Sequence, residues 1–97
     1  MDALQSLLAF FQAIAHDNRI RPMHIAVFTT LLQYRIGKGC INPITVYSRD
    51  VMAIAKISKA TTYCRCLSEL GEYGYIGYKP SFKKNQPSSI YFKEVTT

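Results

Sequence analysis

The sequence has few of the residues from which metal and catalytic sites are built. Its 97 residues include 3 cysteines and 2 histidines. No Cys-x-x-Cys pair occurs, and neither His16 nor His24 stands at a zinc-type spacing from a thiol. A Ser-His-Asp set, a pair of catalytic carboxylates and a phosphate-binding glycine loop are also missing. We therefore expect a protein that is not an enzyme and that holds no metal ion and no cofactor.

The sequence also lacks long hydrophobic runs and a disulfide framework. No stretch reaches about 18 uninterrupted apolar residues, which argues against a membrane span. The first 17 residues contain Asp2 and Asp17 but no lysine or arginine, so they do not resemble a secretory leader. An odd number of cysteines without disulfide-type spacing is typical of reduced thiols. The expected location is therefore cytoplasmic.

Acidic residues are scarce, and they are unevenly distributed. The chain has 6 acidic residues against 12 Lys and Arg, a net charge of +6. Residues 1–17 carry two acids and no base (−2), whereas residues 18–97 carry all 12 basic residues and four acids (+8). A region this basic suggests a polyanionic partner, with nucleic acid as the expected class. The alternative is that the charge only keeps the protein soluble.

The order of the predicted elements indicates the fold. The chain is long enough for one compact domain and too short for two. The patterns predict four helices: from Ala3 to about His16, from Pro22 to about Ile36, a short one opening at Ser48, and from Lys59 to about Tyr73. They also predict a short strand within 40–47 and two further strands within 75–82 and 88–95. This is the layout of an α+β winged helix-turn-helix, with four helices, a short strand and a C-terminal β-hairpin wing. A single domain would span residues 1–97, with a basic winged-helix core over 18–97.

Short polar residues and glycines mark where the predicted helices begin and end. Ser48 and Ser58 are the expected N-caps, and Asp50 suits the positive end of its helix dipole. Gly74 is the expected C-cap, and Gly-Lys-Gly at 37–39 ends the second helix. That second helix is apolar on nearly all sides, which predicts that it forms the centre of the core.

The first predicted helix, within residues 1–17, has a wide apolar face. Its stripe consists of Leu4, Leu7, Leu8, Phe11, Ile14 and Ala15. Phe10 widens this arc to roughly 160°, which is more than a one-sided surface helix needs. Such a helix packs either between two elements of its own domain or against a second chain. A core helix is the simpler interpretation, and a homodimer through this helix is the alternative.

The helix over 59–73 divides into two faces when Leu67 is placed at the centre of its buried side. Ala60, Tyr63, Cys64, Leu70 and Gly71 then face the core, with Cys66 and Tyr73 on one flank. The outward side carries Thr61, Thr62, Arg65, Ser68, Glu69 and Glu72. Because Cys64 and Cys66 project about 200° apart, they cannot bind one ion. We expect Cys64 to be a core residue, Cys66 to be half-buried, and Cys40 to lie in a loop.

The outward face and the nearby cations form the expected DNA-binding surface. Arg65 would pair with guanine, and the threonines would contact phosphate or a thymine methyl group. The candidate DNA-binding residues are Arg49, Lys56, Lys59, Thr61, Thr62, Arg65, Ser68, Lys79, Lys83 and Lys84. The alternative is that these side chains are simply solvated, and that the hairpin lysines protect a sheet edge. Glu69 and Glu72 favour that alternative, because carboxylates repel phosphates.

The sequence resembles a known family over residues 42–82. The stretch NPITVYSRDVMAIAKISKATTYCRCLSELGEYGYIGYKPSF is similar to small winged helix-turn-helix proteins of Bacteroides-type bacteria, which often travel with mobile elements. The matching positions are Asn42, Pro43, Ser48, Arg49, Asp50, Lys56, Ile57, Thr62, Tyr63, Arg65, Cys66, Leu67, Leu70, Gly74, Tyr75, Ile76, Tyr78, Pro80 and Ser81. The resemblance implies a winged-helix fold and a DNA-binding regulator or a mobile-element accessory protein.

Three functions follow as expectations. The first is a duplex-DNA-binding transcriptional regulator that inserts helix 59–73 into the major groove. The second is a protein-interaction module that docks through Leu7, Phe10 and Phe11. The third is an excision or replication accessory protein that bends DNA without strong base preference.

Overall fold

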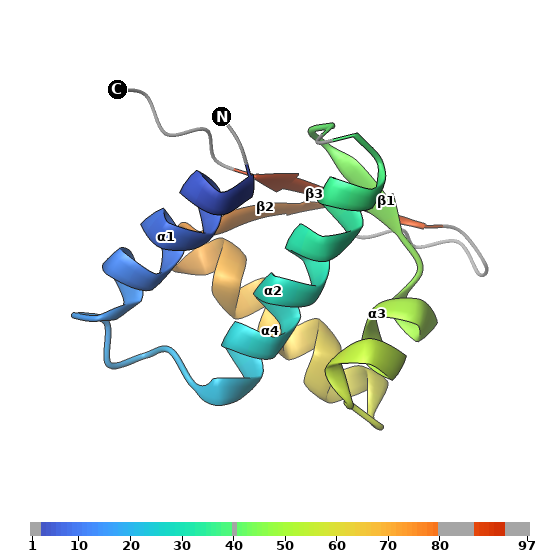
Figure 1. Ribbon diagram of the computed structural model, residues 1–97. Helices are drawn as coiled ribbons and strands as arrows, with labels where there is room; N and C mark the ends of the chain where they lie inside the picture. Colours follow the sequence, from blue (N-terminus) through green and yellow to red (C-terminus); the bar gives the residue numbers. More distant parts are fainter. Residues whose placement is uncertain (1–2, 40, 80–86, 93–97) are drawn as a thin grey trace.

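Four helices and a small antiparallel sheet make up the computed structural model, which describes residues 3–39, 41–79 and 87–92 (Figure 1). The elements are α1 (Ala3–Ile14), α2 (Pro22–Gly37), β1 (Ile44–Val46), α3 (Ser48–Ala55), α4 (Ala60–Glu72), β2 (Ile76–Lys79) and β3 (Ser88–Phe92). The predicted α+β class and the predicted order of elements are confirmed. The predicted strand residues 80–82 and 93–95, the turn residues 83–86 and Cys40 lie outside the described residues.

The three strands pair in the order β1-β3-β2, and both pairings are antiparallel. Ile44 lies opposite Ile90, and both are fully buried. The Asn42 side chain extends this pairing, since its Nδ2 donates to the Phe92 carbonyl (2.7 Å) and its Oδ1 accepts from the Phe92 N–H (2.9 Å). Burial alternates along β1 and β3, so one face of the sheet packs against the helices and the other does not.

α2 forms the centre of the molecule, as its all-round apolar pattern predicted. It contacts α1, α3, α4 and β1, and Figure 1 shows it between the other helices. Val27 and Leu31 have no exposed surface, and Phe28 is 4% exposed. A helix surrounded on all sides needs apolar residues at nearly every angle, which is why its sequence shows little amphipathicity.

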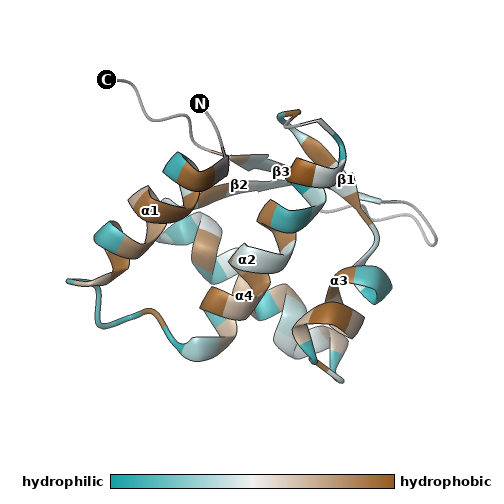
Figure 2. Cartoon of the chain, viewed as in Figure 1, coloured by the Kyte–Doolittle hydropathy of each residue, from teal (hydrophilic) through white to brown (hydrophobic). Residues whose placement is uncertain are grey.

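α1 buries a different face from the one its apolar stripe predicted. Phe10 is 4% exposed, and its ring stacks on Phe28 with centroids 3.9 Å apart and meets Tyr75 edge-on at 5.4 Å. Leu4, Leu8 and Phe11 are instead 63%, 52% and 42% exposed. The aromatic contacts of Phe10 outweigh the burial of the smaller leucines, so the helix turns that side toward α2. Figure 2 shows that hydrophobic colouring recurs along α1.

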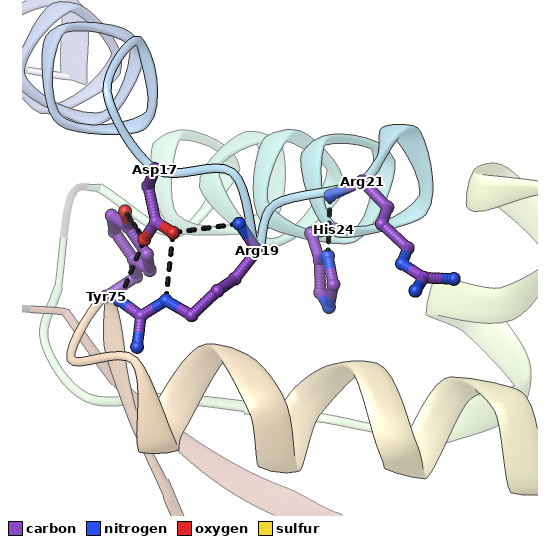
Figure 3. A network of polar contacts seen from close by, with 5 residues as sticks. All are labelled: Asp17, Arg19, Arg21, His24 and Tyr75. Carbon is purple, nitrogen blue, oxygen red and sulfur yellow. Dashed lines mark hydrogen bonds and ion pairs between the residues drawn. The ribbon is translucent and has the colours of Figure 1, made fainter.

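Polar contacts tie the loop after α1 to the start of β2 (Figure 3). The Asp17 carboxylate accepts from the Tyr75 hydroxyl (2.6 Å) and from the Nε (2.9 Å), Nη2 (2.9 Å) and backbone N–H (3.0 Å) of Arg19. The Arg19 guanidinium lies 4.2 Å from the centroid of the Tyr73 ring. The bonds from Arg19 and Tyr75 hold the pKa of Asp17 well below its usual range. This cluster therefore fixes how α1 meets the rest of the molecule.

The ends of the helices correct two predicted N-caps, and the C-cap of α4 is Tyr73, with the predicted glycine directly after it. Ser58 is not the N-cap of α4, which follows Lys59 without a side-chain cap, and Ser48 is the first residue of α3 rather than its cap. At the far end of α4, Gly74 adopts φ +91°. Its N–H donates to Gly71 (3.2 Å), and the Tyr75 N–H donates to Leu70 (2.9 Å), which is a Schellman motif. A left-handed residue is required there, so Gly74 ends the helix as predicted.

Candidate nucleic-acid interface

α3 and α4 form a helix pair joined by a tight four-residue connection, residues 56–59. Lys56 turns the chain by adopting a left-handed conformation (φ 63°, ψ 40°), and the Ile57 N–H donates to the Met52 carbonyl at 3.0 Å. Ile57 is 8% exposed and Val51 is fully buried, so this turn is held against the core. The result is that the first residues of α4, Ala60 and Thr61, are exposed, while Tyr63 one turn later is buried.

The buried side of α4 consists of Tyr63, Cys66, Leu67 and Leu70. The predicted roles of the two cysteines are therefore reversed, because Cys64 is exposed and Cys66 is buried. The centre of the buried side lies between Tyr63, Leu67 and Leu70 rather than at Leu67, which turns Cys66 inward. Burial raises the pKa of the Cys66 thiol, which makes it a poor nucleophile.

The outward side of α4 presents Thr61, Arg65 and Ser68, all of them exposed as predicted. Thr62 is half-buried on the flank that faces the start of α2. The opening turns carry hydroxyl groups and one guanidinium group and no carboxylate, since Glu69 and Glu72 come later in the helix. This arrangement provides hydrogen-bond donors and one positive charge on the half of a helix that could enter a groove of DNA.

Glu69 was expected on the outward face, but it is held back against α2 by His24. The Nε2 of His24 lies 3.0 Å from Oε1 of Glu69, and the His24 side chain is only 3% exposed. The backbone N–H of Arg21 donates to the Nδ1 of His24 at 2.9 Å (Figure 3). Because Nδ1 accepts, the ring proton lies on Nε2, which donates to Glu69. The sequence could not reveal this contact, which joins residues 45 positions apart.

The remaining predicted cations surround the helix pair. Arg49 is exposed, and its guanidinium lies 4.9 Å from the centroid of the Tyr47 ring, with Nε 3.8 Å from Asp50. Lys56 and Lys59 are exposed in the connection between α3 and α4, and Lys79 is exposed at the end of β2. Lys83 and Lys84 lie outside the described residues.

A cation outside the predicted DNA-binding residues also lies beside α4. Arg21, the residue before α2, lines a groove together with Thr62, Arg65 and Glu69. Arg21 lies in the irregular segment between α1 and α2, so no helical or strand periodicity predicts which way its side chain faces. Only the packing of α2 against α4 brings it next to Arg65.

The described part of the chain contains no group of three or more His, Cys, Asp or Glu residues arranged to hold a metal ion. Among the same residues, no helix combines the length and the apolar character needed to cross a membrane. Comparison of the chain with protein-family models, with curated proteins and with solved structures found no match.

Proposed function

We propose that this chain is a winged helix-turn-helix protein that binds duplex DNA and regulates transcription. The observation that carries the proposal is the outward side of α4, where Thr61, Arg65 and Ser68 are exposed while Glu69 is drawn toward α2. The order of helices and strands, with β1 pairing to β3 and β3 to β2, supports the winged-helix identity. The net charge of +6 supports an anionic partner.

In this proposal α4 enters the major groove with its N-terminal half toward the bases. Arg65 reads guanine, and Thr61 contacts a thymine methyl group or a phosphate. Arg49, Lys56, Lys59 and Lys79 contact the phosphate backbone from both sides of α4. The connection between β2 and β3 acts as the wing, and its Lys83 and Lys84 follow the backbone or the minor groove. The resemblance stated above further suggests that the protein belongs to a mobile element of a Bacteroides-type bacterium and acts in the cytoplasm.

A direct titration tests this proposal. Labelled duplex DNA should bind the full chain at low salt, and the affinity should fall as a power of the salt concentration. Selection from a random DNA pool should return one preferred sequence, and Arg65→Ala should reduce that preference by about tenfold or more. The proposal fails if duplex DNA does not bind measurably even at low salt. Strong bending with no base preference would favour the excision or replication accessory role.

A second feature, the exposed apolar side of α1, supports a homodimer. Leu4, Leu8 and Phe11 recur along one side of the helix and are exposed, although the Phe11 ring meets the Phe10 ring of the same helix edge-on at 5.8 Å. Phe10, one of the three residues of the predicted docking surface, is buried and takes no part. Two-fold pairing through α1 would place two α4 helices on one DNA site, and a palindromic selected sequence would support it. The same surface is where a different protein would bind if the chain were an interaction module.

A further inference from the structure

A groove of about 500 Å³ lies between the start of α2 and one flank of α4. It is lined by two exposed arginines from different elements, Arg21 before α2 and Arg65 in α4. From this juxtaposition we propose that the groove is a phosphate-binding site in which Arg21 and Arg65 hold one phosphate group between them. The proposal rests on the proposed function for the source of that phosphate, which we take to be the DNA backbone.

The chemistry of the lining suits a phosphate. Each guanidinium group offers a planar set of donors that matches the spacing of two phosphate oxygens. Thr62 lines the same groove, and its hydroxyl group supplies a further donor for a third oxygen. Pro22 and Met23 provide an apolar wall on the α2 side. Charged hydrogen bonds beside such a wall are screened less by water than those on an open surface.

The charges in the groove favour an anion in spite of Glu69. Two guanidinium groups and one carboxylate line it, a sum of +1, because His24 is neutral when its Nδ1 accepts from the Arg21 N–H. Glu69 accepts from the Nε2 of His24, which fixes its carboxylate on the α2 side of the groove. Its charge still opposes a phosphate, so Glu69 should limit the affinity without preventing binding.

The position of the groove links it to the reading face of α4. Arg65 belongs to both, since it is exposed on α4 and also lines the groove. Its guanidinium group has five N–H donors, so one part of it can donate to the phosphate while another donates to guanine. A backbone phosphate seated beside Arg65 would therefore lie next to the bases that the first turns of α4 contact. Arg21 would thereby fix the depth and register of α4 in the major groove, a positioning role rather than a reading role.

Two variants that each remove one positive charge test whether the bound phosphate belongs to the DNA backbone. Arg21→Ala should reduce the slope of log affinity against log salt by about one, and should weaken all DNA sequences alike. Lys38→Ala removes the same charge at the opposite end of α2, where Lys38 donates to the Thr45 carbonyl, and should leave the slope unchanged. Equal changes for the two variants would mean that Arg21 acts only through overall charge, and this would overturn the assignment of a DNA phosphate.

Inorganic phosphate tests the groove without DNA. In NMR spectra of the full chain, the Nε–H signals of Arg21 and Arg65 should shift together and saturate as phosphate is added. Arg21→Ala should abolish the Arg65 shift. Glu69→Gln keeps an oxygen for His24 but removes the repulsion, and should tighten binding several-fold. If it weakens binding instead, Glu69 contacts the ligand and the proposed charge arrangement is wrong.

The two experiments separate the proposals. A saturable response to phosphate in a protein that does not bind DNA would contradict the proposed function. It would still support the phosphate site, with a free phosphorylated molecule as the ligand. If DNA binds, Arg21→Ala leaves the salt slope unchanged and phosphate gives no response, the phosphate site is contradicted and the proposed function stands.

Discussion

At the scale of single residues, contacts distant in sequence decide what α4 presents. His24 and Glu69 are joined by one hydrogen bond of 3.0 Å, and that bond moves a carboxylate from the outward face to the flank. Cys66 takes the buried position expected for Cys64 because the helix is rotated by a fraction of a turn about its axis. Both effects depend on the partner packed against the helix, so neither follows from the spacing of residues alone.

Tyr63 provides a test of an unsatisfied buried group. It is 2% exposed, and its hydroxyl has no hydrogen-bond partner within the described ranges 3–39, 41–79 and 87–92. Burying such a group without a partner costs free energy, so Tyr63→Phe should raise the free energy of unfolding by up to about 1 kcal/mol. Urea denaturation measures the change. Tyr75→Phe, which loses the 2.6 Å bond to Asp17, should be destabilising and serves as the control. A destabilised Tyr63→Phe would show that the hydroxyl has a partner.

The cluster around Asp17 should make stability depend on pH in two directions. The pKa of Asp17 is lowered by its bonds from Arg19 and Tyr75, so the folded state favours the ionised form. Its contribution is complete above the unfolded pKa of about 4 and is lost as the pH falls further. Burial and the bond to Asp17 raise the pKa of Tyr75 to about 12. The contribution of Tyr75 is therefore complete below about pH 10 and is lost as the pH rises toward 12.

Melting temperatures measured from pH 7 to pH 2 check the acid limb. The wild-type Tm should fall more steeply below about pH 4 than that of Asp17→Asn, which cannot ionise at this position. Parallel curves for the two proteins would contradict the role given to Asp17.

At the scale of the elements, helix ends and helix faces were not equally predictable. Gly74 ends α4 as expected, because few residues other than glycine accept its φ of +91°. The predicted serine caps are wrong, because α3 and α4 both start without a hydrogen bond from a capping side chain. The prediction of the buried side of α1 is wrong because this helix has two apolar faces. Only the packing of Phe10 on Phe28 decides which of them is buried.

Two glycine substitutions should show whether the positive φ of Gly74 is what makes glycine necessary there. Gly74→Ala places a side chain at φ +91° and should lower the free energy of unfolding by about 1–2 kcal/mol. Gly37→Ala, at the last position of α2 with nothing within 4 Å of the added Cβ, should be neutral or slightly stabilising. Thermal or urea denaturation of both variants gives the comparison. Equal losses would show that the positive φ is not the cause.

At the scale of the whole molecule, α1 is distinctive because it exposes hydrophobic side chains and carries no Asp, Glu, Lys or Arg. Residues 3–16 contain no charged Asp, Glu, Lys or Arg, whereas the rest of the chain carries all 12 basic residues. Two copies with a net charge of +6 repel each other over most of their surface. The uncharged, exposed side of α1 is therefore where a second copy would approach at the least electrostatic cost.

A charge placed on that side should disrupt the proposed dimer. Leu8 is 52% exposed, so Leu8→Glu should change the free energy of unfolding by no more than about 0.5 kcal/mol. It should nevertheless shift the sedimentation coefficient from that of a dimer to that of a monomer. Gln33→Glu adds the same charge at an exposed position of α2 and should leave the dimer intact. A wild-type chain that stays monomeric at all concentrations would contradict the dimer.

The sequence alone determined the order of the elements, the central place of α2, the glycine end of α4 and the exposed residues Thr61, Arg65 and Ser68. These features follow from local periodicity and backbone preference, which neighbouring residues dictate. Only the tertiary structure decided which side of α1 is buried, which cysteine lies in the core, that His24 holds Glu69, and that Arg21 meets Arg65 in one groove. Each of these depends on two segments far apart in the chain, and their relative position is set by packing rather than by either segment alone.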